Sequence, residues 1–471
     1  MINKSGFTAE AQRHGVLVRI SRGIREAGSC SSLRLCASAV KSLFVIFFFG
    51  AVSSAHAALP IQHWVAPSGA QVYFVENHDL PMLDINVDFA AGSSRGTSAK
   101  SGLAGVALHM MSLGAGGMTE TEISKRMADV GADLGGRFDQ DRAGVSLRTL
   151  SHAREREVAL SVFSAVLQQP DFPESVLQRE KTRAIAGLKE AQTQPDFIAD
   201  NAFTTALYGT HPYALPEEGE VGTLEALSRN DVVDFYRVHY TSNGATVALI
   251  GDVTRAEAEA IAQRLTEKLP KGATPAAIPP VPLPTQAVVK EIVHPATQSH
   301  ILLGYPGIKR EDPDYFPLLV GNYVLGGGGF DSRLTKEVRD KRGLAYSVHS
   351  YFMPFKEAGP FQMGLQTKKE QTSEALSVVR KTLRDFIGQG PMEAELKQAK
   401  NNLIGGFPLR IDSNKKILEY LSLIGFYQLP LDYLERYPKS VARVTLDQVR
   451  ESFKRRIDPD KMVTVVVGGP E

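Results

Sequence analysis

Two similar β-strand patterns occur in the sequence, one near its middle and one at its end. Residues 245–253 read ATVALIGDV, and residues 462–470 read MVTVVVGGP. Each is a short apolar run rich in β-branched residues and followed by turn residues, which is typical of a buried strand. The elements before each pattern also come in a similar order. The sequence therefore predicts a duplicated α+β unit, with a sheet and helices packed on one side of it in each copy.

A segment rich in proline and alanine separates the two copies. Residues 270–287 read PKGATPAAIPPVPLPTQA, without helical periodicity. Such a composition favours an extended, semi-rigid linker. We therefore assign residues 58–270 to the first domain, 271–287 to the linker and 288–471 to the second domain.

Apolar periodicity and capping residues predict the elements of the first domain. Ser101 and Gly114 are the expected N-cap and C-cap of its first helix. Thr119 and Glu122 form an expected capping box for the second helix. The predicted strands are 71–76, 83–90, 133–139, 143–150 and 245–251. The predicted helices are 101–113, 119–130, 153–169, 173–192, 196–208, 223–238 and 255–269.

The second domain shows the same kinds of pattern. The glycine run at 326–329 lacks the G-K-[ST] sequence of a phosphate loop and is expected to turn one helix into the next, with Asp331 or Ser332 as the cap. The predicted strands are 300–304, 344–352, 360–367 and 462–467. The predicted helices are 312–325, 331–341, 369–388 and 392–405, with further helices to about residue 456.

The N-terminal segment has the pattern of an export signal. Residues 43–53, LFVIFFFGAVS, form an apolar run that is too short to span a bilayer as a mature helix. Lys41 precedes the run, and Ala55-His56-Ala57 follows it with small residues at the two positions that a signal peptidase recognises. We expect cleavage after Ala57, and retention as an uncleaved anchor is the alternative. After cleavage no stable membrane span is expected.

Composition limits the chemistry of the mature chain. Both cysteines, Cys30 and Cys36, lie before the cleavage site, so no disulfide or thiol nucleophile is expected after it. Residues 1–57 carry a net charge of +5 and the whole chain +1, so the mature chain is mildly acidic at −4. Without a basic run, it is a poor candidate for binding nucleic acid. The sequence also lacks a G-x-S-x-G nucleophile elbow.

Four segments resemble the M16 peptidase family, the pitrilysin and mitochondrial-processing-peptidase type of zinc peptidase. They occur in the order that is typical of that family and spread over nearly all of the mature chain. The segments are VENHDLPMLDINVDFAAGSSRG (75–96), YGTHPYALP (208–216), FYRVHYTSNGATVALIGDV (235–253) and LGGGGFDSRLTKEVRDKRGLAYSV (325–348). The resemblance implies two homologous α+β domains, each a mainly antiparallel sheet with helices on one face, which face each other as a clamshell around a peptide chamber.

The zinc motif of that family is degenerate in this chain. Active members carry H-x-x-E-H on a helix, where two histidines at i and i+4 bind zinc and the glutamate activates its water. The corresponding helix here reads GLAGVALHM, with Gly105 and His109 at the two histidine positions and Leu108 at the glutamate position. The distant glutamate ligand of the family falls near Ala186 or Gly187. The resemblance therefore implies no metal site on this chain.

The distribution of histidines supports the same expectation. In residues 58–471 no two histidines are four apart, so no other helical turn offers a zinc-binding pair. A zinc site assembled from distant residues is the alternative. His109 lies on an otherwise apolar helix, and we expect it to be a hydrogen-bonded structural histidine.

Arg339 and Tyr346 match a second family feature. The resemblance implies that an arginine and a tyrosine seven residues apart in the second domain hold the substrate and the oxyanion formed during hydrolysis. A guanidinium can bind a carbonyl or carboxylate with two donors, and a phenol can donate to an oxyanion. The structural alternatives are a solvated charged helix face, KEVRDKR, for Arg339 and a half-buried strand aromatic for Tyr346.

Loss of the zinc ligands together with retention of Arg339 and Tyr346 is typical of the non-catalytic subunit of bacterial heterodimeric M16 peptidases. The resemblance thus implies a periplasmic, substrate-binding subunit that is inactive alone. Its partner is expected to be an M16 homologue with an intact motif and bound zinc, and its substrates are expected to be peptides. Two alternatives are a non-enzymatic peptide-binding or scaffold protein and an autonomous zinc peptidase with atypical ligands.

Overall fold

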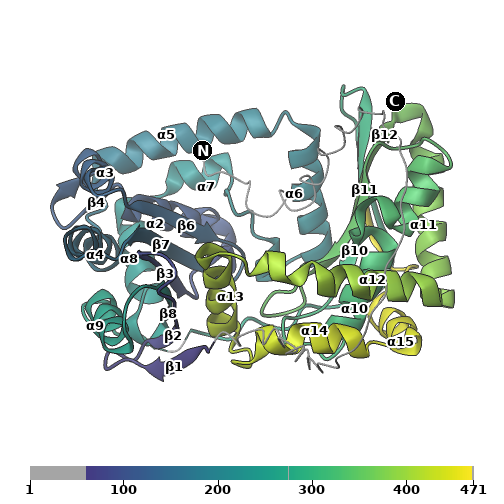
Figure 1. Cartoon of the computed structure of the whole chain (residues 1–471). Coiled ribbons are helices and arrows are strands. Elements are labelled where there is room, and N and C mark those ends of the chain that lie inside the picture. Colours follow the sequence, from purple (N-terminus) through teal and green to yellow (C-terminus); the bar gives the residue numbers. More distant parts are fainter. Residues whose placement is uncertain (1–59, 274, 469–471) are drawn as a thin grey trace, which may run out of the picture. The chain divides into compact units, whose positions relative to one another are not determined.

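The sheet of the first domain contains six strands in the order β1-β2-β8-β3-β7-β6 (Figure 1). Every neighbouring pair is antiparallel except β2 and β8, which are parallel. Strand β1 was not predicted, because its four residues are too few to show alternation. The strands are β1 Gln62–Val65, β2 Gln71–Glu76, β3 Met82–Phe89, β6 Asp133–Phe138, β7 Ala143–Leu150 and β8 Thr246–Gly251.

The computed structural model describes residues 60–273 and 275–468, so the predicted signal peptide and its cleavage site lie outside the described residues. Among the helices that it describes, none combines the length and the apolar character needed to cross a bilayer. Residues 271–273 and 275–287 of the predicted linker contain neither helix nor strand.

The helices of the first domain follow the predictions with two corrections. The predicted helix 223–238 is two helices, because Ser228 starts a new capping box with Asp231. The first helix begins after Gly102, which has a φ of 86°, and not after Ser101, and it ends at Ser112 instead of Gly114. The capping box of Thr119 is confirmed. The helices are α2 Leu103–Met111, α3 Glu120–Asp129, α4 Ala153–Gln168, α5 Glu174–Ala191, α6 Pro195–Tyr208, α7 Val221–Ala226, α8 Arg229–His239 and α9 Arg255–Thr266.

The sheet of the second domain repeats the arrangement of the first. Its order is β11-β12-β10-β13-β9, with β9 and β13 parallel and the other pairs antiparallel. Read from the opposite end, this is the order and direction of β2-β8-β3-β7-β6, with β13 in the place of β8. The predicted duplication of a mainly antiparallel α+β unit is therefore confirmed. The strands are β9 Val288–Ile292, β10 Gln298–Pro306, β11 Val348–Phe352, β12 Pro360–Lys368 and β13 Val463–Val467.

Two helices predicted in the second domain are shorter and partly of the wider π type. The predicted helix 312–325 is α10 followed by a π-helix at Tyr323–Gly327. The predicted helix 331–341 is helical only from residue 333 and becomes a π-helix at Thr335–Asp340. Rare π turns often accompany functional sites. The helices are α10 Tyr315–Asn322, α11 Thr372–Gln389, α12 Glu393–Gly405, α13 Asn414–Tyr427, α14 Tyr433–Arg443 and α15 Leu446–Arg456.

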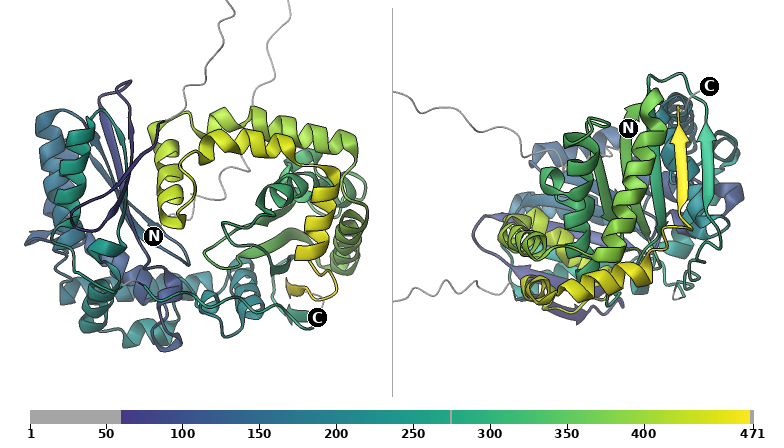
Figure 2. Two further views of the ribbon diagram at one scale, coloured as in Figure 1. Left: turned by 90° about the horizontal axis from the view of Figure 1, so that it is seen from below. Right: turned by 90° about the vertical axis from the view of Figure 1, so that its right-hand side faces the viewer.

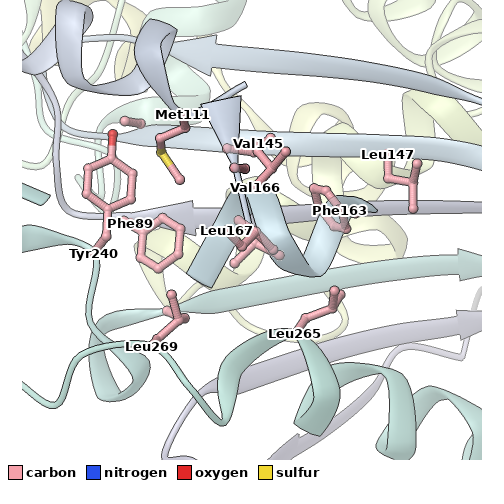
Figure 3. Packing of buried hydrophobic residues seen from close by; sticks show 14 of the residues in the cluster. Phe89, Met111, Val145, Leu147, Phe163, Val166, Leu167, Tyr240, Leu265 and Leu269 are labelled. Carbon is pink, nitrogen blue, oxygen red and sulfur yellow. The ribbon is translucent and has the colours of Figure 1, made fainter. Parts of the chain in front are cut away.

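The core of the first domain lies between one face of its sheet and its own helices (Figure 3). Successive strand residues point to opposite faces, so β3 directs Ile85 and Phe89 toward this core and Asp84, Asn86 and Asp88 toward the other face. The core includes Phe89, Met111, Val145, Leu147, Phe163, Val166, Leu167, Tyr240, Leu265 and Leu269.

The other face of each sheet receives one helix from the opposite domain (Figures 1 and 2). Helix α13 packs on β2, β8 and β3, and helix α6 packs on β10 and β13. Glycines allow the close approach: a Cβ on Gly425 would lie 2.5 Å from Thr246, and one on Gly304 would lie 2.3 Å from Phe203. The expectation of helices on one face of each sheet was therefore incomplete. Each domain contributes one helix, α6 or α13, to the second face of the other domain's sheet.

The contact of α13 with the first sheet predicts a large effect of Leu421→Ala. Leu421 is fully buried with Ile417 against Val75 and Ile250. Truncation leaves a cavity between the domains and should lower the free energy of unfolding by about 2–5 kcal/mol, measured by urea denaturation. As a control, Leu409→Ala removes a side chain that is 61% exposed and should change stability by about 0.5 kcal/mol or less. Equal effects would contradict the docking of α13.

Burial of His239 predicts a pH dependence of stability. Burial lowers the pKa of His239 from 6.5 to about 4, and the positive charge of Arg95 acts in the same direction. Between these values the unfolded chain binds a proton that the folded chain does not, so the free energy of unfolding should fall as the pH is lowered from about 6.5 to about 4.

The variant His239→Gln should flatten this part of the stability profile, measured by thermal melts at several pH values. His78 gives a control of opposite sign, because hydrogen bonds to Asp252 and Glu76 raise its pKa. The stabilisation that His78 contributes is fully present below pH 6.5, and it is lost as the pH rises through the raised pKa of His78 in the folded chain. A profile unchanged by His239→Gln would refute the prediction.

Candidate functional site

The degenerate zinc helix, α2, is tied to α5 through its single histidine. The Nε2 atom of His109 lies 3.1 Å from the Oε2 atom of Glu180. The other carboxylate oxygen of Glu180 accepts hydrogen bonds from Arg179 and Arg183, at 2.6 and 2.9 Å. Burial favours the neutral acid, but the hydrogen bonds from Arg179 and His109 outweigh it and lower the pKa of Glu180. His109 thus contacts a carboxylate that is held in its charged form.

The remaining positions of the motif offer no ligand atoms. A Cβ on Gly105 would make ordinary contacts with Glu217 and Phe138, at 3.5 Å, and nothing lies within 4 Å of a Cβ on Gly187. Leu108 packs against the first core. In residues 60–273 and 275–468, no group of three or more His, Cys, Asp or Glu side chains is placed to hold a metal ion. These residues do not fit the zinc centre of the active enzymes, which needs three protein ligands.

Arg339 and Tyr346 lie together on the surface of the second domain. The guanidinium carbon of Arg339 is 5.2 Å from the ring centroid of Tyr346 and 4.8 Å from that of Phe330. Tyr346 is 87% exposed and Phe330 is 70% exposed. Tyr346 precedes β11, so it is not a half-buried strand residue. We call these three residues the arginine–aromatic cluster.

Anchored backbone holds this cluster in place. Ser332, one of the two expected caps, accepts from the N–H of Thr335 and donates to the carbonyl of Gly329, where φ is 61°. Leu344, two residues before Tyr346, is buried, and its carbonyl accepts from Thr367. The exposed rings therefore project from a fixed segment of backbone.

The charged run around Arg339 divides into two parts. Lys341 and Arg342 both pair with Glu337, at 2.6 and 2.8 Å, as expected for a solvated face. Arg339 instead contacts the two rings, where a cation is attracted to the aromatic face. Arg342 therefore belongs to a solvated, charged helix face, which was the structural alternative for Arg339, whereas Arg339 itself contacts aromatic rings.

Sequence reasoning missed the polar contacts that join the two domains. The buried carboxylate of Asp141 accepts from Tyr213 at 2.6 Å, from Tyr427 of α13 at 2.9 Å and from the N–H of Lys356 at 2.6 Å. Burial raises the pKa of Asp141, partly offset by the hydrogen bond from Tyr213. Phe330 and the partner of His109 were also missed, because no spacing rule connects them to the positions they contact.

Comparison with known proteins agrees with this geometry. A family model described as insulinase (peptidase family M16) matches residues 72–219, and one described as the peptidase M16 inactive domain matches residues 226–403. A solved structure of a peptidase M16 inactive domain from Pseudomonas fluorescens is 37% identical, covers 88% of this chain and 99% of its own, and has a TM-score of 0.85. The chain belongs to the M16 peptidase family.

The curated relatives include a protein named as a non-peptidase homolog and proteins named as zinc proteases. The non-peptidase homolog YmxG of Helicobacter pylori is 23% identical over 430 residues, which is 91% of this chain and 98% of that protein. An uncharacterized zinc protease of Streptomyces coelicolor, SCO5738, is 27% identical over 369 residues, or 76% of this chain and 79% of that protein. The chain is thus an M16 homologue with a degenerate zinc motif, and it resembles relatives of both descriptions.

The hydrogen bond of His109 predicts a modest, zinc-independent effect on stability. His109→Ala should lower the free energy of unfolding by about 1 kcal/mol, because it removes one hydrogen bond to a charged partner. Zinc or a chelator should leave the melting temperature of the native chain and the variant unchanged in differential scanning fluorimetry. His152→Ala is the control, since His152 makes no capping hydrogen bond. A melting temperature that rises with zinc only when His109 is present would reveal a metal site.

Proposed function

We propose that this chain is the non-catalytic, substrate-binding subunit of a periplasmic M16 zinc peptidase. The observation that carries the proposal is an asymmetry between the domains. The first domain keeps the zinc helix as a structural element, with His109 bonded to Glu180, whereas the second domain presents Arg339 and Tyr346 on its surface. A chain that retains substrate-binding groups without a hydrolytic centre requires another chain for the reaction.

The arginine–aromatic cluster supplies the chemistry that such a partner needs. Arg339 carries planar donors that can bind a peptide carbonyl or a terminal carboxylate. The exposed hydroxyl of Tyr346 can donate a hydrogen bond to the oxyanion that forms on the scissile carbonyl. Stacking between the guanidinium and the two rings restricts Arg339 before substrate binds, which reduces the entropy lost on binding.

Both sheets also have an edge where an extended peptide can add as a strand. Among the described strands, β6 pairs with β7 alone and β11 with β12 alone. An edge strand presents unpaired N–H and C=O groups, and β-strand addition is a common mode of peptide recognition. Tyr346 lies two residues before β11, so one of these edges begins beside the cluster.

The proposed partner is an M16 homologue with intact H-x-x-E-H, which holds the zinc. Export by the N-terminal signal would place this chain in the periplasm, where the partner would have to be exported as well. A chain that binds peptides without such a partner would act as a scaffold. The two functions differ in one observable, which is hydrolysis on mixing.

The proposal predicts activity only in the mixture and its loss in two variants. The chain and a co-purified zinc-motif homologue should each be inactive on a fluorogenic peptide and active together. Arg339→Ala or Tyr346→Phe should lower kcat/KM of the mixture by about 100-fold, as expected for loss of one oxyanion donor or substrate clamp.

The control is Arg342→Ala, which removes a neighbouring charge that pairs with Glu337 and should change kcat/KM by about twofold or less. Gel filtration must show that all variants still assemble. Peptide binding without hydrolysis in any pairing would favour the scaffold. Chelator-sensitive hydrolysis by the purified chain alone would favour an autonomous peptidase and overturn the proposal.

A further inference from the structure

Arg137 belongs to β6, an edge strand of the first sheet, and lies near α13. Residues directly opposite each other on antiparallel strands share a face, and Arg137 of β6, Gly144 of β7 and Asp88 of β3 form one such row. Asp88 accepts a hydrogen bond from Ser422 of α13, so the row lies on the face that receives that helix. Glu419 of α13 is within electrostatic range of Arg137.

The guanidinium of Arg137 has no partner in the part of the chain that the structure describes. It makes no hydrogen bond or ion pair there, although burial lowers its pKa, with repulsion from Arg142 acting in the same direction. Asp88, Asp139 and Glu419 attract this cation only at a distance, so the partly buried guanidinium loses hydration without gaining a hydrogen bond. Such an arrangement is expected where a ligand supplies the acceptor.

The carboxylates around Arg137 are occupied by other groups. Asp139 accepts from the Nε atom of Arg142 at 2.9 Å and from two backbone N–H groups. Asp88 is 3.7 Å from Arg142 and accepts from Ser422. Its other oxygen makes no hydrogen bond with a described residue, yet Arg137 does not reach it. The side chain of Arg137 is therefore not committed to either acid.

The strand beside Arg137 has room for a peptide. Gly135 and Gly136 precede Arg137 in β6, and Gly144 faces it, so three neighbouring positions carry no side chain. The outer edge of β6 pairs with no described strand. A peptide added there would direct alternate side chains to the face of Arg137.

We propose that Arg137 selects peptides that carry a carboxylate, through a charge-assisted hydrogen bond to that group. The inference rests on the proposed function, because it assumes that the chain binds peptides along β6. The carboxylate can belong to an internal acidic residue or to the peptide C-terminus. Glu419 is exposed and makes no hydrogen bond or ion pair among the described residues, so its charge would compete with the substrate for the same cation.

The test uses four labelled pools of ten-residue peptides, measured by fluorescence anisotropy with the full-length chain and with the mixed complex. Each pool holds either Glu or Gln at one internal position and ends in either a free acid or an amide. The native chain should bind at least one carboxylate pool about tenfold more tightly than its neutral counterpart, a difference of about 1.4 kcal/mol. The pool that shows the difference identifies the source of the carboxylate.

Two variants should act in opposite directions. Arg137→Gln should reduce the preference to about one while leaving the affinity for the neutral pool unchanged, and Glu419→Gln should increase the preference because it removes the competing charge. Arg126→Gln, which removes the same charge from the exposed face of α3, should have no effect.

The outcomes separate the two proposals. If the mixed complex hydrolyses the neutral and acidic pools equally, or if Arg137→Gln weakens both alike in a folded protein, the carboxylate preference is wrong and the subunit function stands. If the mixed complex hydrolyses no pool but the chain still binds the carboxylate pool more tightly, the subunit function is wrong and the carboxylate preference stands; if the chain binds no pool, both proposals are wrong.

Discussion

The exchange of α6 and α13 between the domains is the constraint on which the structure depends. Each sheet buries one face under its own helices, and a single helix from the other domain covers part of the second face. Ile417 and Leu421 of α13 pack against the strands. Gly425 of the same helix permits close approach to Thr246. Farther along the same helix, Ser422 and Tyr427 bond to Asp88 and Asp141. Helix α13 thus makes both an apolar contact and hydrogen bonds with the first domain. These contacts fix the position of the edge strand β6 relative to α13.

The first domain has kept the scaffold of a hydrolytic site while its chemistry has changed. The helix that would carry two zinc ligands and a base carries one imidazole, and this imidazole bonds to a carboxylate already held by two arginines. A structural role explains why His109 can remain after Gly105 and Leu108 have replaced the other groups. The second domain differs, because Arg339 and Tyr346 contact each other at the surface instead of packing into the core.

The sequence was sufficient for most of the elements and for the duplication, because periodicity reports which side of a strand or helix is apolar, but the short strands β1 and β9 were not predicted. The sequence did not predict contacts between segments that are distant in sequence. The apolar faces of α6 and α13 show that these helices are buried, but not that each is buried against the other domain. The break at Ser228 was missed since the apolar pattern continues across it. The resemblance to the spacing of the M16 family marked Arg339 and Tyr346, whereas nothing in the sequence connects Phe330 to them or Glu180 to His109. The unpaired state of Arg137 depends on what its neighbours bind, which no local pattern reveals.

The interlocked helices also determine when the chain can become stable during synthesis. The side chains of Asn77 and Asn414 form a hydrogen bond across 337 residues of sequence, and the apolar patch at Val75, Ala248 and Ile250 stays uncovered until α13 has been made. Contacts so distant in sequence form slowly, and a nascent first domain exposes an apolar surface that favours aggregation. The second face of the first sheet can therefore be covered only after Asn414–Tyr427 have been synthesised.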